Sequence, residues 1–379
     1  YKQISNINVS GSDQISKIFD FRGSLYFISS HSGFEKMYKF ESGLFSQVSD
    51  IFSGDDEITA IAKDDTALYF QARSVLGTKI YAYSGITGAG IKQVSNLNAF
   101  GGDSLLNEMS ILDDRLYFVS SENPAGEDRL MYYNGAVIDA IDQDLYAAGV
   151  DEISYVKAAA NAVYFQGLDT NGLKKMWRYD PVFNSGVGRI EKITGLYDGF
   201  DDEVRDIEEL NNFIYFVGKN SIGREKLFQL DPSTKSSKQL SSTNVIGSDN
   251  ILEFKILGGK LFLSAKNTAG QQKPFMYDPA QSLFFQLTDF FAGNEDPENF
   301  TLYGEFIYFT IKINSDGHQK LFLFDQNSNT IIQVADLNQN GSDNIGNLTV
   351  VNSVLYFTGE VNGNQKLFRL CDESTGCIN

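Results

Sequence analysis

One short apolar triplet, Leu355-Tyr356-Phe357 in its last copy, recurs along the chain and constrains the fold more than any other feature. Eight copies can be counted, and they begin at Leu25, Leu68, Leu116, Val163, Ile214, Leu261, Ile307 and Leu355. The first residues of neighbouring copies lie 43 to 51 residues apart. A repeat of this period is typical of solenoids, propellers and arrays, in which each unit buries its apolar face against the next.

Each repeat has the pattern of four short strands. Runs of β-branched and aromatic residues alternate with clusters of Gly, Asn, Asp and Ser, and no segment keeps a helical period. Four strands in a repeat of this length form one blade of a β-propeller. The sequence therefore predicts an all-β fold, an eight-bladed β-propeller of four-stranded antiparallel blades, as a single domain over residues 1–379.

The two ends of the chain predict how the propeller closes. Residues 1–7 match residues 331–337, which have the pattern of a fourth strand, whereas the last repeat has three clear strands that end near Leu370. We therefore expect residues 1–8 to supply the outer strand of the last blade, and residues 371–379 to form a C-terminal tail. Closure by the N-terminal strand leaves only short strand edges exposed, which limits edge-to-edge aggregation.

Charge and motif content narrow the classes of partner and activity. The net charge is −18, which disfavours nucleic acid and anionic membranes as partners because both attract basic proteins. No run of about 18 apolar residues is present, so no membrane insertion is expected. The Gly-x-Ser-x-Gly, His-Glu-x-x-His and phosphate-loop motifs are absent as well. The sequence therefore predicts a protein that is not an enzyme.

Two charged positions recur in all eight repeats, one before the triplet and one after it. The acids are Asp13, Asp56, Asp103, Asp151, Asp202, Asp249, Asp296 and Asp343, and the bases are Lys36, Lys79, Arg129, Lys175, Lys226, Lys273, Lys320 and Lys366. Each acid is expected to hold its own turn by hydrogen bonds and to lie within reach of a neighbouring base. The alternative is an eightfold ligand site. Eight similar copies favour the structural role, because a binding site normally breaks such symmetry.

One turn between repeats has the pattern of a calcium loop. Asp336, Asn338, Asn340 and Asp343 alternate with other residues around Gly341. Alternating oxygen ligands with a glycine turn are the arrangement that hard cations use, although the glutamate that ends an EF-hand loop is absent. The sequence therefore predicts no cofactor other than calcium, for which these four residues are the candidate ligands.

The two cysteines, Cys371 and Cys377, lie close together near the C-terminal end. Such a pair can close a small disulfide loop in an oxidising compartment. The alternative is a pair of free thiols. We expect the disulfide, because the neighbouring residues have no zinc-ligand character.

The last repeat also carries a family resemblance. Its segments Leu348-Thr349-Val350-Val351-Asn352, Leu355-Tyr356-Phe357-Thr358, Gly363 and Lys366-Leu367-Phe368 resemble the bacterial repeats named for a Glu-Leu-Trp…Asp-Gly-Thr signature. The Trp position of that signature is Phe or Tyr in most repeats of this chain and Trp only at Trp177. The resemblance implies a bacterial protein that is secreted or lies at the cell surface, and it implies no activity.

These features together predict a non-enzymatic module, extracellular or at the cell surface, that binds protein or glycan partners or serves as a scaffold. The alternative is a carbohydrate-active enzyme or a lectin that uses one face of the propeller. That alternative stays open because paired carboxylates for glycoside hydrolysis are recognised by their separation in space, which a sequence does not give.

Overall fold

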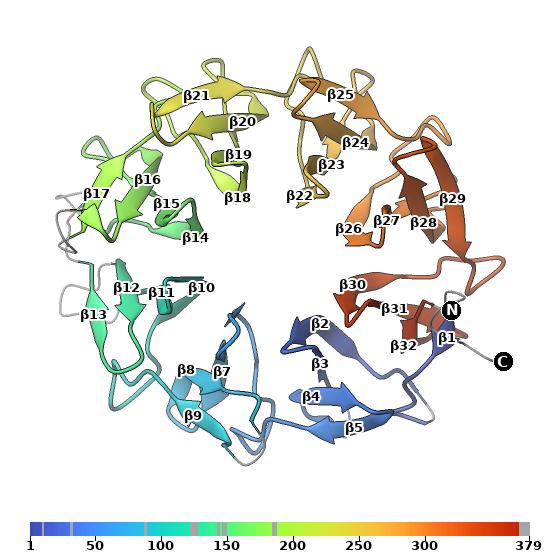
Figure 1. Cartoon of the computed structure of the whole chain (residues 1–379), viewed down its shortest axis with the longest axis horizontal. Coiled ribbons are helices and arrows are strands. Elements are labelled where there is room, and N and C mark those ends of the chain that lie inside the picture. The colour runs from blue at the N-terminus through green and yellow to red at the C-terminus, as the bar shows by residue number, and fades with distance from the viewer. Residues whose placement is uncertain are drawn as a thin grey trace. The chain divides into compact units, whose positions relative to one another are not determined.

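The computed structural model describes residues 1–9, 11–30, 33–86, 89–121, 128–141, 145, 150–183 and 188–370. These residues form 32 strands in eight sheets, and every sheet contains four antiparallel strands (Figure 1). This confirms the predicted all-β, eight-bladed β-propeller. We number the sheets as blades 1 to 8 along the chain. The chain divides into two compact units, Tyr1–Ile58 with Leu252–Asn379, and Thr59–Ile251.

The first unit contains blades 1, 6, 7 and 8, and within each blade every strand pairs with the next one named. Blade 1 is β2 (Ile15–Phe21), β3 (Ser24–Ser29), β4 (Lys36–Glu41) and β5 (Leu44–Gln47); blade 6 is β22 (Glu253–Leu257), β23 (Lys260–Lys266), β24 (Gln272–Asp278) and β25 (Leu283–Gln286); blade 7 is β26 (Glu298–Tyr303), β27 (Phe306–Lys312), β28 (Gln319–Asp325) and β29 (Thr330–Ala335); blade 8 is β30 (Gly346–Val351), β31 (Val354–Val361), β32 (Asn364–Arg369) and β1 (Lys2–Gln3).

The second unit contains blades 2 to 5, with the same order of pairing. Blade 2 is β6 (Ile61–Lys63), β7 (Leu68–Ser74), β8 (Gly77–Tyr83) and β9 (Ile91–Gln93); blade 3 is β10 (Leu105–Leu112), β11 (Arg115–Ser120), β12 (Arg129–Tyr133) and β13 (Ile138–Ala140); blade 4 is β14 (Ser154–Ala159), β15 (Ala162–Leu168), β16 (Lys174–Asp180) and β17 (Arg189–Lys192); blade 5 is β18 (Arg205–Leu210), β19 (Phe213–Lys219), β20 (Glu225–Asp231) and β21 (Ser236–Gln239). Among the described residues, no helix is long and apolar enough to cross a membrane.

Blade 8 takes its fourth strand from the other end of the chain, as predicted (Figure 1). β1 pairs antiparallel with β32, so that Lys2 lies opposite Arg369 and Gln3 lies opposite Phe368. The regular pairing covers only these two positions. Beyond it, the amides of Ile4 and Ser5 both donate to the Leu367 carbonyl, at 2.9 and 3.3 Å. The attachment of the N-terminal segment therefore extends past the strand itself.

Tight turns join the first and second strands of several blades. Asp113-Asp114, Asn211-Asn212 and Gly258-Gly259 have positive φ at both residues, as type I′ turns require. These turns match the twist of the flanking strands, and Asn, Asp and Gly adopt positive φ most readily. In blade 5 the turn sets the register, with Leu210 opposite Phe213. The polar clusters between the strand patterns therefore fix which side chains face the core.

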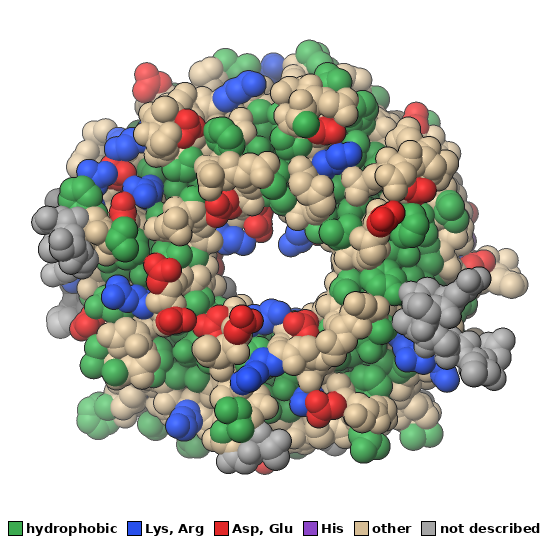
Figure 2. All heavy atoms as spheres, viewed as in Figure 1, with side chains coloured by type: hydrophobic (Ala, Val, Ile, Leu, Met, Phe, Trp, Pro, Cys, Tyr) green, Lys and Arg blue, Asp and Glu red, His purple; other side chains and the backbone are tan. Residues whose placement is uncertain are grey.

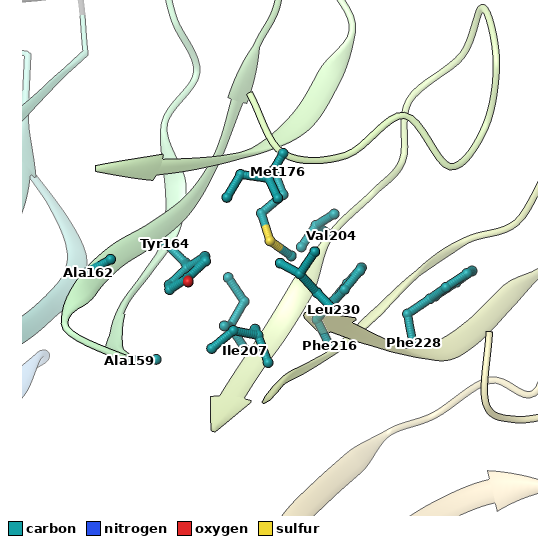
Figure 3. Close-up of a cluster of buried hydrophobic side chains, with 11 residues drawn as sticks. Ala159, Ala162, Tyr164, Met176, Val204, Ile207, Phe216, Phe228 and Leu230 are labelled. Carbon is teal, nitrogen blue, oxygen red and sulfur yellow. The ribbon is translucent and has the colours of Figure 1, made fainter. Parts of the chain in front are cut away.

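The repeated triplet supplies the core between neighbouring blades. Because side chains alternate along a strand, Tyr164 of β15 packs in the cluster shared with blade 5, whereas Val163 and Phe165 pack in the cluster shared with blade 3. Figure 3 shows Tyr164 beside the side chains of Ile207 and Val204 from the next blade. The aromatic residues of the triplet are thus core residues, as the repeat predicted.

Candidate functional site

Buried charge pairs connect the third strands of the blades to the turns that lead into the next blade. The described residues form seven such pairs, Lys36–Asp56, Lys79–Asp103, Lys175–Asp202, Lys226–Asp249, Lys273–Glu295, Lys320–Asp343 and Lys366–Asp13. We call each pair, with the groups bound to it, a latch. In the Lys226–Asp249 latch the charged atoms lie 2.6 Å apart, and the two side chains are 3% and 0% exposed.

Each latch also holds the backbone of its own turn. Asp249 Oδ1 accepts a hydrogen bond from the Asn244 amide (2.9 Å), and Lys226 Nζ donates to the Asn244 carbonyl (2.9 Å). Both charges are therefore neutralised and hydrogen-bonded inside the protein, which buried charges require. The geometry supports the structural role that the repeated positions suggested, although that role itself stays a prediction.

Two of the eight predicted positions need comment. Lys273 pairs with Glu295 (2.9 Å), and not with the predicted Asp296, which pairs with Lys312 (2.5 Å). The turn from Thr288 to Glu295 is one residue shorter than the turn from Ser241 to Asp249. The turn from Ser49 to Asp56 is equally short, and there an aspartate pairs with the lysine. At the remaining position, Asp151 is buried and accepts a hydrogen bond from the Leu145 amide (3.4 Å), while Arg129 begins β12.

A buried hydroxyl takes part in most latches, and the sequence interpretation missed it. Ser241 Oγ donates to Asp249 Oδ2 (2.5 Å) and accepts a hydrogen bond from the Leu227 amide (2.7 Å). The corresponding residues are Ser5, Ser49, Ser95, Thr194, Ser241 and Thr288. In blade 7 the position is Ala335, and Asp343 Oδ2 is buried there without a hydrogen-bond partner. Asp56 Oδ2 and Asp202 Oδ2 are in the same state although their latches contain Ser49 and Thr194. A Gln two residues earlier in most copies was the available signal.

The oxygens predicted as calcium ligands are directed at a lysine ammonium. Lys320 Nζ lies 2.5 Å from Asp336 Oδ1, 2.7 Å from the Asn338 carbonyl and 2.8 Å from Asp343 Oδ1. Burial opposes the charge of Lys320, but the hydrogen bonds to Asp336 and Asp343 raise the pKa of its ammonium above the usual value. Asn340 lies in the same turn. Calcium stays a prediction, and it would have to displace this ammonium.

Two further observations concern bound metals and the predicted disulfide. In the part of the chain that the structure describes, no group of three or more His, Cys, Asp or Glu side chains is gathered for a metal ion. Cys371 and Cys377 lie outside the described residues, so the disulfide stays a prediction.

A polar pocket in the second unit interrupts the repeated pattern. Its volume is about 280 Å³, and it lies among β14, β15, β16, β18, β19 and β20, which are neighbours in Figure 1. The lining residues are Tyr155, Gln166, Lys174, Asp201, Glu203, Arg205, Lys219 and Glu225. The pair of Lys219 and Glu203 has a counterpart in Lys312 and Asp296 of blade 7. Lys174, Arg205 and Tyr155, in contrast, have no identical residue at the matching positions of the other blades. The pocket therefore departs from the symmetry of the repeats, as a binding site normally does, whereas the latches follow that symmetry.

The residue that follows the triplet of blade 4 differs from its counterparts in most other blades. Gln166 stands where most other blades have an apolar or hydroxyl side chain: Ile28, Val119, Val217, Ser264, Thr310 and Thr358. Only Gln71 of blade 2 is a second glutamine at this position. Tyr155 departs from its counterparts too. Its φ is positive, at 56°, and the residues with similar values in other blades are the smaller Asp206, Asn299 and Asn347. A bulky residue rarely adopts this conformation.

Charged groups of both signs line the pocket. Lys174 Nζ lies 3.0 Å from Glu152, Arg205 lies 3.0 Å from Glu225, and Lys219 pairs with Glu203. The hydrogen bond to Glu152 raises the pKa of Lys174, so its charge is retained at neutral pH. Acidic and basic side chains are also interspersed on the face of the molecule that Figure 2 shows. The pocket is thus polar, with charged groups that stay partly exposed.

Comparison with known proteins gives a fold and no family. No family model matches the chain, and no curated protein matches it. Among solved structures, a prolyl endopeptidase is 10% identical with a TM-score of 0.58 over 93% of this chain and 55% of its own length. A puromycin-hydrolysing peptidase of Mycobacterium tuberculosis is 10% identical with a TM-score of 0.57 over 95% and 60%. This chain therefore spans little more than half of these two proteins.

A third solved structure matches along almost its whole length. The β-propeller domain of the trilobed protease of Pyrococcus furiosus is 12% identical with a TM-score of 0.52, over 86% of this chain and 99% of that domain. At such identities the likeness shows the fold alone. The propeller domain of that protease is described as having an open velcro topology, whereas in this chain β1 pairs with β32.

These likenesses correct the predicted function. The prediction of a non-enzymatic, extracellular or cell-surface binding or scaffold module is wrong, because several of the structures with the highest TM-scores are peptidases or puromycin hydrolases. The prediction took the absence of a catalytic motif as evidence against an enzyme. A propeller that serves an enzyme needs no such motif, since the reacting groups can lie elsewhere. None of these peptidases is named for a carbohydrate substrate either.

Proposed function

We propose that this chain is a peptidase-associated propeller, which receives peptides for a hydrolase and does not itself cut them. The observation that carries the proposal is the match to the propeller domain of a protease over 99% of that domain. The prolyl endopeptidase and the puromycin-hydrolysing peptidase support it, because this chain matches 55% and 60% of their lengths.

The sequence is in keeping with a division of labour between binding and catalysis. The chain has no Gly-x-Ser-x-Gly motif, which marks one widespread class of hydrolase nucleophile. The partners that follow from the proposal are a catalytic domain or subunit and its peptide substrates. A secreted or cell-surface location stays a prediction of the family resemblance.

The proposal is tested with peptides that carry no terminal charges. Equilibrium dialysis of the full chain against a mixture of N-acetylated, C-amidated peptides, read by mass spectrometry, should show retention of a subset of them. A mixture of neutral oligosaccharides is the control and should not be retained. The chain alone should also release no chromophore from peptide p-nitroanilides. Retention of no peptide by the folded chain, or hydrolysis by the chain alone, would overturn the proposal.

A further inference from the structure

One atom in the pocket lining lacks the hydrogen bond that its burial requires. Gln166 is 5% exposed, its Nε2 donates to Ser154 Oγ (3.0 Å), and its Oε1 is buried without a partner. A buried polar atom without a hydrogen bond destabilises the folded state, so natural proteins retain few of them. Because Gln166 lines the pocket, a donor group in a bound ligand can satisfy this acceptor.

The charges of the lining indicate what kind of donor is missing. Lys174, Arg205 and Lys219 each have a carboxylate partner. Asp201 is the lining carboxylate outside these pairs, and it accepts a hydrogen bond from the Lys174 amide (2.9 Å). Asp201 and Gln166 thus offer two acceptors in one small pocket, one of them charged. A cationic N–H donor matches both, because charge-assisted hydrogen bonds are the stronger kind.

The same lining can also receive a negative group. Lys174 is paired with Glu152 and Lys219 with Glu203, and these side chains are 30% to 54% exposed. Exposed ion pairs contribute little to stability, so a ligand carboxylate can replace the protein carboxylate at either ammonium at little cost. The pocket therefore offers acceptors to an ammonium group and donors to a carboxylate group within one cavity.

The size of the pocket suits a ligand of about a single residue. One water molecule takes up roughly 30 Å³ of liquid, so about 280 Å³ holds on the order of nine non-hydrogen atoms. A free amino acid such as leucine has this size. The ring of Tyr155 also lines the pocket and offers an apolar face to its side chain.

We propose that this pocket binds the zwitterion of a free α-amino acid, with the ammonium group at Gln166 Oε1 and Asp201 and the carboxylate group at Lys174 and Lys219. The inference deepens the proposed function, on which its biological meaning rests, because peptide hydrolysis releases such amino acids. A bound amino acid would place a product, or the terminal residue of a peptide, on the propeller.

The test uses L-leucine, L-serine, L-glutamate and L-lysine as probes on the full chain, by isothermal titration calorimetry. At least one should bind. Leucinamide, which lacks the carboxylate, and N-acetyl-leucine, which lacks the ammonium, should each bind at least about tenfold more weakly than leucine, or not at all. A tripeptide that begins with leucine has the ammonium but an amide in place of the adjacent carboxylate, so it should bind as weakly as leucinamide. Binding equal to that of leucine would overturn the assignment of the carboxylate group to Lys174 and Lys219.

Variants assign the site. Gln166→Leu should abolish binding, whereas Gln71→Leu, at the matching position of blade 2, should leave it unchanged. Asp201→Asn keeps an acceptor for the Lys174 amide but removes the charge, so it should weaken binding at least about tenfold in a normally folded protein. The inference fails if none of the four probes binds, if leucinamide and N-acetyl-leucine bind as tightly as leucine, or if Gln71→Leu and Gln166→Leu behave alike.

This test can fail independently of the proposed function. Retention of blocked peptides without binding of any free amino acid would overturn the pocket assignment and leave the peptide-receiving propeller standing. Binding of a free amino acid without retention of blocked peptides would do the opposite.

Discussion

Lys226 illustrates how much a single buried charge contributes to this fold. Its ammonium is almost fully buried and lies between Asp249 Oδ1 and the Asn244 carbonyl. A buried ion pair need not exceed a well-packed apolar pair in stability, but removal of one partner leaves the other charge uncompensated. Loss of one charge of a latch should therefore lower the free energy of unfolding by much more than the intact pair adds to it.

We expect Lys226→Met to lower the free energy of unfolding by about 3–5 kcal/mol, because Asp249 would stay buried without its cation. Lys312→Met is the matched control, since Lys312 forms a partly exposed pair with Asp296 and should cost no more than about 1 kcal/mol. Urea unfolding of both variants measures the difference. Equal losses would show that burial of the latch does not matter for its contribution.

Ala335 offers the reverse experiment. It stands where the other latches have Ser or Thr, and Asp343 Oδ2 has no partner. At the same spacing of eight residues, Ser5, Ser95 and Ser241 each donate to the acid of their latch. Ala335→Ser should supply the missing donor and stabilise the protein by about 1 kcal/mol. Ala162→Ser, which places a hydroxyl in the apolar cluster around Tyr164, should destabilise it instead. A lower melting temperature for Ala335→Ser than for the native protein would contradict this account of the latch.

Glu253 gives a pH dependence with a definite sign. Burial raises the pKa of its carboxyl above the usual value of 4.5, although the Asn299 amide donates to it at 2.9 Å. The folded state therefore holds the proton more tightly than the unfolded state, and stability is lost as pH rises through the window between the two pKa values. Glu253→Gln should thus raise the unfolding midpoint at neutral pH and lose this advantage below the unfolded-state pKa.

Thermal unfolding from acidic to neutral pH measures this effect. Glu305→Gln, at an exposed position, is the control and should leave the pH profile unchanged. A profile for Glu253→Gln that runs parallel to the native one would show that burial of this carboxyl has no consequence for stability.

At the residue scale, the sequence predicted the acid and base positions because they recur in register with the triplet. It placed one acid at Asp296 in place of Glu295, since the pattern followed aspartate and the length of the turn varies by one residue between blades. The hydroxyl of Ser241 and the buried Oε1 of Gln166 were missed for another reason. Their importance comes from hydrogen bonds, or the lack of one, across strands that are far apart in the sequence.

Among the secondary-structure elements, β1 is the shortest strand and has the longest-range partner. Only Lys2 and Gln3 pair with β32, but the segment that follows contributes Ser5, whose Oγ accepts from the Leu367 amide (2.7 Å), and Asn8, whose carbonyl accepts from Lys366 Nζ (2.7 Å). Strand pairing and latch formation are thus joined in one stretch. Removal of the stretch would uncover the edge of β32.

Deletion of residues 1–8 should therefore lower the melting temperature much more than deletion of residues 1–3. The shorter deletion removes the ladder at two positions, whereas the longer one also removes the partners of Lys366 and Leu367. Differential scanning calorimetry with light scattering measures stability and aggregation together. Equal melting temperatures for the native chain and the longer deletion would refute this role of the N-terminal segment.

The sequence predicted this strand because residues 1–7 repeat the pattern of residues 331–337, and similar patterns fold alike. It could not predict the pocket around Tyr155. That pocket depends on which side chains of two blades meet, and this does not follow from the spacing of the repeat.

At the scale of the whole molecule, the net charge of −18 affects stability. Like charges repel and destabilise the compact state, and salt screens that repulsion, since the Debye length falls from about 30 Å at 0.01 M to about 8 Å at 0.15 M. The melting temperature should therefore rise over this range of sodium chloride. The latches should not contribute to the rise, because buried pairs are screened far less. A fall would mean that attractive surface pairs outweigh the repulsion.

The latches also bear on how a protein of this kind can be copied and rearranged. Six of the seven described latches join residues only 20 to 27 positions apart, such as Lys226 and Asp249. A stretch of gene that runs from the third strand of a blade to the turn before the next blade therefore encodes a complete latch. Duplication or recombination at the turn between first and second strands would pass every such latch on intact, and a new blade would arrive with its connection to the next one already encoded.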